Sequence, residues 1–407
     1  MLTLVHNIGT LVTLKNASKK KGRNIKEKDV SLVRDASFLV DKGLITEINP
    51  KTIPENCNKI DIKGNCVLPG FVDAHTHLVF AGNRAHEFQL RSEGATYEEI
   101  HKKGGGILST AEKTRKAGED ELFKTALNFL KLAKEAGTTS IEIKSGYGLT
   151  TQDELKILRV IQKLKREKIV TIIPTFLGAH TIPQEYKSQP QKYVEILCQE
   201  MLPQVAQEKL ADFCDIFIEK GSFSLLQAEK ILGIATDLGF KIRVHADQFS
   251  DMGAALLALK YKATSIDHLE HVSKKTMKLL AQSKTTATLL PGVAFFLRHN
   301  QAPARALLDH GVRVALASDF NPGSCMSFNL SLMATIAITQ MDLSLSEALV
   351  GISLNGAYSL GLENVTGSLE VGKRADFVIL DSPQFQMPFY HFGTNYLKKT
   401  HSYLDFL

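Results

Sequence analysis

Two histidines separated by one residue stand at the end of a short apolar segment. Residues 69–77 read Pro-Gly-Phe-Val-Asp-Ala-His-Thr-His, so the pair is His75 and His77. Because alternate residues of a β-strand project to the same side, we expect the two imidazoles to point together and to chelate a metal ion. Two exposed loop histidines would show the same spacing, so further donors are needed to make the pattern specific.

Three later apolar segments also end in residues that bind metals. They close with His245, His268 and Asp319. Imidazole and carboxylate donors suit zinc or iron better than calcium or magnesium, and the lack of neighbouring cysteines favours a catalytic over a structural site. We predict one zinc or iron ion per chain, bound by His75, His77, His245 and Asp319. The plain alternatives are a helix N-cap for Asp319 and a buried, hydrogen-bonded histidine for His268.

These residues fall on a repeating pattern of short β-branched segments and longer helical stretches. The segments cover residues 67–72, 139–143, 170–176, 215–218, 242–245, 265–268, 286–290 and 314–317. Such alternation is typical of βα units, and eight of them predict an α/β fold of the (β/α)₈ TIM-barrel type. The C-terminal ends of all eight strands meet at one rim in this fold, so the candidate ligands should converge there.

The two ends of the chain differ from this pattern. Residues 9–14, 36–40 and 44–48 read as strands without a long helix between them, and residues 376–380 are again strand-like. We predict a small β-sandwich-like domain built from residues 1–65 and 356–407, beside a barrel domain of residues 66–355. A glycine triplet at 104–106, in the long excursion after the first strand, is either a lid hinge or a plain loop.

The composition limits the kinds of partner. With 44% hydrophobic and 23% charged residues among 407, the chain is typical of a globular protein. The net charge is +6, and we interpret the densest basic run, residues 19–23, as a solvated loop and not a nucleic-acid patch. Five scattered cysteines without a CxxC pair indicate a reducing compartment. The start of the chain lacks a signal-peptide pattern, and no window approaches the roughly 18 apolar residues of a membrane span. We therefore expect a cytoplasmic protein with no membrane or nucleic-acid partner.

The motifs taken together resemble the amidohydrolase superfamily of metal-dependent barrel hydrolases. The resemblance rests on residues 69–77, His245, His268 and Ser318-Asp319, and residues 367–376 are similar to the return of that superfamily into its small β domain. One family within it, which opens an imidazolone ring in histidine degradation, is similar in six separated motifs. These are residues 77–88, 144–149, 175–180, 245–248, 267–270 and 318–324. The resemblance runs to about residue 381 and implies hydrolysis of 4-imidazolone-5-propanoate to N-formimidoyl-L-glutamate by a homodimer.

The same resemblance implies a set of substrate-binding residues. Those implied to contact the imidazolone are Arg84, Tyr147, His180, Gln248 and Ser324, and those implied to contact the ring-opened product are Asn321 and Gly323. The substrate's carboxylate tail calls for a cation, and Arg84 beside the histidine pair can bind it in two parallel hydrogen bonds unless it forms a surface ion pair. Taken singly, Tyr147 and His180 would more often serve in packing or in a local hydrogen bond.

The candidate catalytic residues are Asp319, His268, His180 and Gln248. Some family members carry glutamate in place of Gln248 as a proposed base, but an amide cannot accept a proton at neutral pH. We therefore expect Gln248 to position water or substrate. Asp319 or His268 is then the base, and His180 or His268 donates toward the developing oxyanion.

A single metal is expected because relatives with two metals usually have a bridging lysine or carboxylate from the third or fourth strand. Lys144 instead lies on the second strand, and we interpret Glu219, on the fourth, as a supporting residue. Two alternatives remain. Another amidohydrolase, such as a cyclic-imide hydrolase or an aminoimidazole or guanine deaminase, would share the metal ligands but has less need of Arg84. A non-catalytic barrel scaffold would typically have lost ligands.

Overall fold

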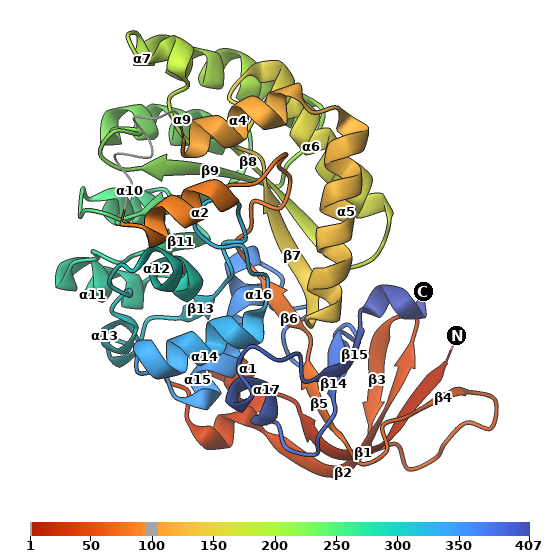
Figure 1. Cartoon of the computed structure of the whole chain (residues 1–407). Coiled ribbons are helices and arrows are strands. Elements are labelled where there is room, and N and C mark those ends of the chain that lie inside the picture. The colour runs from red at the N-terminus through yellow and green to blue at the C-terminus, as the bar shows by residue number, and fades with distance from the viewer. Residues whose placement is uncertain (1, 95–104) are drawn as a thin grey trace.

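The structure, a computed structural model, describes residues 2–94 and 105–407 and contains two sheets (Figure 1). The larger is an eight-stranded parallel sheet in sequential order, as predicted. Its strands are β6 (Phe71–Asp73), β7 (Thr138–Lys144), β8 (Thr171–Ala179), β9 (Phe213–Ile218), β10 (Lys241–Ala246), β11 (Ser265–His268), β12 (Thr286–Leu289) and β13 (Val314–Leu316). Beyond the strand ends, Asp319 N donates to His75 O at 3.0 Å and His77 N donates to Phe320 O at 2.9 Å. These bonds join the first and last strands, so the ring closes at the level of the candidate ligands.

Helices surround the barrel and bury an apolar face on it. They include α5 (Glu119–Glu135), α6 (Thr151–Arg166), α9 (Leu225–Asp237), α10 (Ala254–Lys260), α11 (Lys274–Gln282), α14 (Leu330–Gln340), α15 (Leu345–Gly351) and α16 (Leu354–Leu360). In α6, Leu158, Ile161 and Leu164 are buried at helical spacing, and the Thr150 side chain caps the helix by accepting from Asp153 N. None of the helices in the described part of the chain is long and apolar enough to cross a membrane.

The second sheet combines both ends of the chain, as predicted. Its strands are β1 (Thr3–Val12), β2 (Leu32–Asp41), β3 (Leu44–Ile48), β4 (Asn58–Asp61), β5 (Cys66–Pro69), β14 (Phe377–Leu380) and β15 (Leu397–His401). They form one mixed sheet and not two facing sheets. Ile45 N donates to Lys373 O and Gly372 N donates to Ile45 O, both at 2.8 Å, so β3 also bonds the segment that precedes β14. The sheet thereby curls around its own apolar core, which includes Phe38 and Phe377.

The first predicted strand, residues 67–72, is divided between the two sheets. Its first part lies in β5, which pairs with β1 and β14, and its second part lies in β6 of the barrel. The change of partners occurs at Gly70, where a Cβ would overlap the Thr139 hydroxyl. At the other end, α16 packs against β6, β12 and β13, so residues 356–360 lie on the barrel. Gly104, of the predicted hinge triplet, lies outside the described residues.

The basic run 19–23 is not a wholly solvated loop, and that interpretation was wrong for Arg23. Its guanidinium donates to the carbonyl oxygens of Ala281, Gly311 and Ser283 at 2.6 to 2.9 Å. Its neighbours Lys19 and Lys20 are exposed. Arg23 thus ties the N-terminal segment to loops of the barrel.

We predict that Arg23→Ala lowers the free energy of unfolding by about 2 kcal/mol, because three carbonyl groups lose a charged donor. Urea unfolding followed by circular dichroism measures the change, and Lys19→Ala is the matched control. A midpoint for Arg23→Ala equal to that of the control would contradict the anchoring role.

Candidate active site

A cavity of about 1420 Å³ opens at the C-terminal rim of the barrel. It gathers nearly all of the predicted site residues. Those lining it are His77, Arg84, Tyr147, His180, His245, Gln248, His268, Asp319, Asn321, Gly323 and Ser324. His75 is fully buried beneath them. Residues separated by more than two hundred positions in sequence therefore share one wall.

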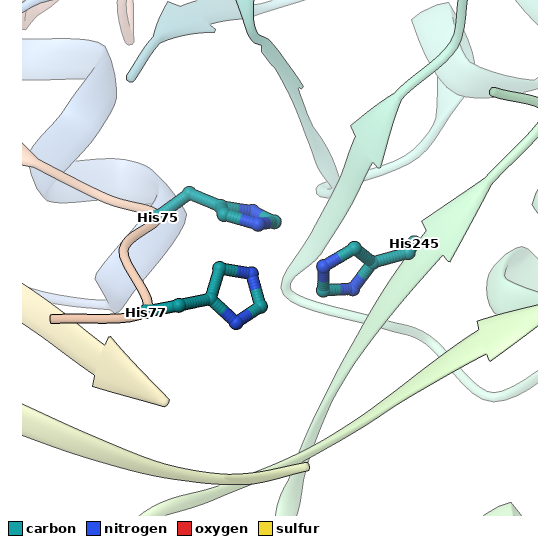
Figure 2. A group of neighbouring side chains, drawn as sticks. All are labelled: His75, His77 and His245. Carbon is teal, nitrogen blue, oxygen red and sulfur yellow. The ribbon is translucent and has the colours of Figure 1, made fainter. Parts of the chain in front are cut away.

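The predicted metal ligands meet at the base of this cavity. Ring nitrogens of His75, His77 and His245 lie within 4.8 Å of one another (Figure 2), and ligand atoms of His75, His268 and Asp319 form a second such group. Asp319 Oδ1 is 3.4 Å from His75 Nε2 and 3.3 Å from His77 Nε2. His75 Nε2, His245 Nε2 and Asp319 Oδ1 are buried without a hydrogen-bond partner among the described residues. Buried lone pairs that converge in this way fit a divalent metal ion.

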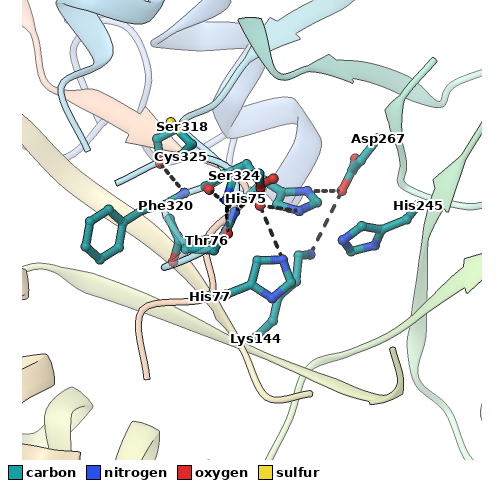
Figure 3. A network of polar contacts seen from close by, with 12 residues as sticks. His75, Thr76, His77, Lys144, His245, Asp267, Ser318, Phe320, Ser324 and Cys325 are labelled. Carbon is teal, nitrogen blue, oxygen red and sulfur yellow. Dashed lines mark hydrogen bonds and ion pairs between the residues drawn. The ribbon is translucent and has the colours of Figure 1, made fainter. Parts of the chain in front are cut away.

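Two carboxylates orient the imidazoles from below. His75 Nδ1 donates to Asp267 Oδ2 at 2.7 Å (Figure 3), and His245 Nδ1 donates to Asp215 Oδ1 at 3.1 Å. Since a carboxylate only accepts, each Nδ1 carries the proton and each Nε2 keeps its lone pair for a metal. Burial, followed by the charge of Lys144, holds the pKa of His75 well below its ordinary value, and burial also lowers that of His245. Both rings are neutral, as ligation requires.

A buried set of charges holds these two carboxylates in place. Lys144 Nζ bonds Asp215 Oδ2 and Glu142 Oε1, both at 2.7 Å, and Arg243 Nη2 bonds Asp267 Oδ2 at 2.9 Å. All five side chains are fully buried. Although burial opposes ionisation, these cations help to hold the pKa of Asp215 and of Asp267 below the ordinary range. The Lys144 ammonium is therefore engaged by carboxylates beneath the site.

Two of the clustered residues have unusual backbone conformations. His268 has φ of 80° and Asp319 has φ of 49°, in the left-handed region that L residues rarely adopt. His268 Nδ1 lies 3.5 Å from Glu270 Oε1. Although burial opposes protonation, the charge of Glu270 raises the pKa of His268. The strained backbone at His268 and Asp319 is typical of functional sites, where surrounding contacts maintain such strain.

Arg84 is an internal cation and not a surface ion pair. Its Nε and Nη2 lie 2.8 and 2.7 Å from Glu87 Oε2, and the two side chains are only 9% and 11% exposed. The guanidinium rests on the backbone of Gly323, where a Cβ would overlap Nη1. Glycine at 323 is therefore what admits Arg84 to the cavity wall.

His180 presents a lone pair to the cavity. Its ring stacks on that of His77 with centroids 4.9 Å apart, and its Nδ1 lies 3.0 Å from Gly146 O. A carbonyl oxygen only accepts, so Nδ1 carries the proton. Burial, then the neighbouring His77 and His245, hold the pKa of His180 well below its ordinary value. Neutral His180 thus offers Nε2 as an acceptor, which differs from the donor role expected from the sequence.

Gln248 lines the cavity from a turn that Glu219 holds. The Glu219 carboxylate accepts from Lys220 N at 2.8 Å, Phe249 N at 2.9 Å, Ser250 N at 3.1 Å and the Ser250 hydroxyl. Both of its oxygens are engaged in these bonds. This agrees with a supporting role for Glu219 and not a metal-bridging one.

The side chain of Asn321 forms its hydrogen bonds within its own turn. Its Nδ2 donates to Asp319 O and to Ser324 Oγ, both at 2.7 Å, and its Oδ1 accepts from Gly323 N and Ser324 N, both at 2.8 Å. Its side chain therefore shapes the turn. The Ser324 hydroxyl, which accepts from Asn321, keeps its proton to donate.

Comparison with known proteins places this site in a family. The model of the amidohydrolase family matches residues 66–400. An imidazolonepropionase of Bdellovibrio bacteriovorus is 45% identical, with 96% of this chain and 93% of the relative covered, and one of Porphyromonas gingivalis is 42% identical, with 97% and 95% covered. The chain belongs to the imidazolonepropionase family of amidohydrolases. Members of this family are hydrolases that act on a cyclic amide. E. coli guanine deaminase, with a TM-score of 0.75, 16% identity and 99% and 98% coverage, shares the fold alone.

Several residues that support this imidazolonepropionase-family site were not predicted from the sequence. They are Glu87, Glu142, Glu154, Asp215, Arg243 and Asp267. A signal for part of the set is present, because Glu142 and Lys144, like Arg243 and His245, occupy alternate positions of apolar barrel strands. Charged residues that share the interior face of such a strand need partners there.

We predict that Asp215→Asn lowers metal affinity by about 10- to 100-fold, because the amide can no longer accept from His245 and pair with Lys144 as a carboxylate does. Competition with a chelator measures the affinity, and Asp120→Asn, on an exposed carboxylate, is the control. Unchanged affinity in a folded Asp215→Asn protein would show that His245 needs no orienting partner.

Proposed function

We propose that this chain hydrolyses 4-imidazolone-5-propanoate to N-formimidoyl-L-glutamate in histidine degradation. The observation that carries the proposal is one cavity with two features. Metal-ligating atoms at its base have no hydrogen-bond partner among the described residues, and its wall includes the largely buried cation Arg84. A small ring with a carbonyl and a carboxylate tail requires both.

The proposed cofactor is one zinc or iron ion per chain, held by His75, His77, His245 and Asp319. Neutral imidazoles and a carboxylate suit either metal, and the Asp267 and Asp215 carboxylates strengthen two of the imidazoles as donors. When bound, such an ion lowers the pKa of water toward neutrality and polarises a carbonyl group.

The substrate tail is assigned to Arg84. The guanidinium binds the propanoate through parallel hydrogen bonds while Glu87 and Gly323 hold its plane. The Ser324 hydroxyl donates to the substrate from the neighbouring turn. Asn321 and Gly323, expected from the resemblance to contact the product, contribute by shaping that turn and by making room for Arg84.

The imidazolone ring is assigned to the opposite wall. His180 Nε2 accepts from a ring N–H, because Nδ1 of the same ring is bonded to Gly146 O. Tyr147 lies beside it, with ring centroids 5.5 Å apart. Gln248 orients water or the ring through its amide, since it cannot take up a proton.

Proton transfer is assigned to Asp319 and His268. Water adds to the ring carbonyl carbon, the bond from that carbon to the ring nitrogen breaks, and the nitrogen leaves with a proton. Asp319 takes the proton from water on the carboxylate oxygen other than Oδ1 and passes it to the leaving nitrogen, while His268 donates toward the developing oxyanion. The two residues face the same point from β11 and from the segment after β13.

The reaction is tested by incubating the purified protein with freshly generated 4-imidazolone-5-propanoate. We expect N-formimidoyl-L-glutamate, identified by mass spectrometry, and elemental analysis giving about one zinc or iron per chain. The His245→Ala variant should lose both metal and activity. Ammonia release from an aminopurine or aminoimidazole without turnover of the imidazolone would support a deaminase instead. Two metals per chain would contradict the mononuclear site.

We predict that Arg84→Ala lowers kcat/KM by a factor that corresponds to a loss of about 2 to 4 kcal/mol of transition-state stabilisation. The metal content should stay unchanged. Arg84→Lys should recover only part, because an ammonium cannot form two parallel bonds. Gly323→Ala should also lower kcat/KM, because the added methyl group would displace the Arg84 guanidinium.

The matched control is Arg159→Ala, which removes an exposed arginine from its pair with Glu208. It should leave the kinetics unaltered. Wild-type kcat/KM in the Arg84→Ala protein would assign the propanoate to another residue.

A further inference from the structure

The turn that carries Tyr147 is wrapped around a buried carboxylate. It spans residues 145–149, between β7 and α6, and the carboxylate belongs to Glu154 in the first turn of α6. Glu154 Oε2 accepts from Gly146 N at 2.9 Å, and Oε1 accepts from Gly148 N at 2.7 Å and from Leu149 N at 2.8 Å. Glu154 is fully buried. Three of the turn's amides thus converge on one side chain.

The turn needs such a partner because its backbone is irregular. Gly146 has φ of 115° and Leu149 has φ of 56°. A Cβ at Gly148 would overlap the backbone nitrogen of Glu154, so the turn and the helix are in direct contact. Without an acceptor, the converging amides would be buried and unpaired, which would destabilise the turn.

Glu154 is not needed to cap its own helix. The Thr150 side chain already accepts from Asp153 N at the start of α6. The Glu154 carboxylate instead points out of the helix toward the turn. A buried carboxylate is a costly way to join a helix to a loop unless the loop must be held accurately.

The turn also positions a second residue of the cavity wall. Gly146 O accepts from His180 Nδ1 at 3.0 Å, and this bond sets which nitrogen of His180 faces the cavity. From the other side, Arg115 donates to Gly148 O at 2.6 Å and to Leu149 O at 3.2 Å. Glu154 and Arg115 together clamp a turn on which both Tyr147 and His180 depend.

We propose that Glu154 is a positioning residue for hydrolysis, whose carboxylate holds the 145–149 turn so that Tyr147 and His180 Nε2 meet the substrate ring. The inference rests on the proposed function, in which these two side chains contact the imidazolone. Glu154 itself is not among the residues that line the cavity, and it does not belong to either group of described residues that could hold a metal ion.

The test is Glu154→Gln, because glutamine has nearly the size of glutamate but replaces one acceptor oxygen with an NH₂ group. That group cannot accept a hydrogen bond from the amides of the turn that it faces. We expect kcat/KM to fall about 10- to 100-fold, mainly through KM, with metal content unchanged. Binding of imidazole-4-propanoate, a ring with the same tail that has no amide to hydrolyse, should weaken in parallel when measured by calorimetry.

A double-mutant cycle separates positioning from general destabilisation. In a Tyr147→Ala background, Glu154→Gln should weaken binding of the analogue by a much smaller factor than in the wild type. The same factor in both backgrounds would overturn the proposal. The matched control is Glu347→Gln on α15, which removes a carboxylate that accepts from Ser344 N at 2.8 Å outside the cavity. It should lower the melting temperature and leave KM unchanged.

If Glu154→Gln does not fold, Arg115→Met tests the same turn from its half-buried side. It should raise KM and weaken analogue binding, and wild-type values would contradict the role of the turn. The inference and the proposed function fail separately. Wild-type protein that binds the analogue but forms no N-formimidoyl-L-glutamate contradicts the function, whereas a folded, wild-type-like Glu154→Gln enzyme contradicts only the positioning role.

Discussion

Two buried hydrogen bonds between a histidine and a carboxylate control the geometry of the site. His75 donates to Asp267 and His245 donates to Asp215, so both Nε2 lone pairs are directed at one point. The carboxylates remain ionised in the barrel interior because Lys144 and Arg243 pair with them and stabilise their negative charge. These paired charges form a layer of side chains that the barrel strands carry. The hydrogen bonds between the strands keep this layer from shifting. A catalytic metal site at this rim depends on this layer more than on the loops above it.

The substrate side of the cavity is built by a different means. Three turns that carry substrate residues are each held by a polar side chain through backbone amides. Glu154 holds the turn of Tyr147, Glu219 holds the turn of Gln248, and Asn321 shapes the turn of Ser324. Glu87 fixes the side chain of Arg84 directly. Loops on a barrel are free to vary, and these contacts give them the accuracy that binding a small ring requires.

The barrel and the clustering of the candidate metal ligands at its rim could be predicted because both follow from local geometry. His75, His77, His245 and Asp319 each close or follow a strand, and parallel strands of a barrel bring their ends to one rim. Asp267 and Asp215 could not be assigned, since His75 is 192 residues from its partner and His245 is 30 residues from its own. The division of the first strand at Gly70 was also missed, because an apolar run does not show which sheet it joins. The protonated nitrogen of His180 depends on one carbonyl 34 residues away.

The proposed site holds one metal ion where the oriented Nε2 atoms and Asp319 Oδ1 meet. Anomalous diffraction from crystals, collected above and below the absorption edge of the bound metal, tests it most directly. We expect a single peak per chain, about 2.0 to 2.2 Å from His75, His77, His245 and Asp319. A second peak bridged by Glu219, or a single peak without His245 or Asp319 in its coordination sphere, would contradict it.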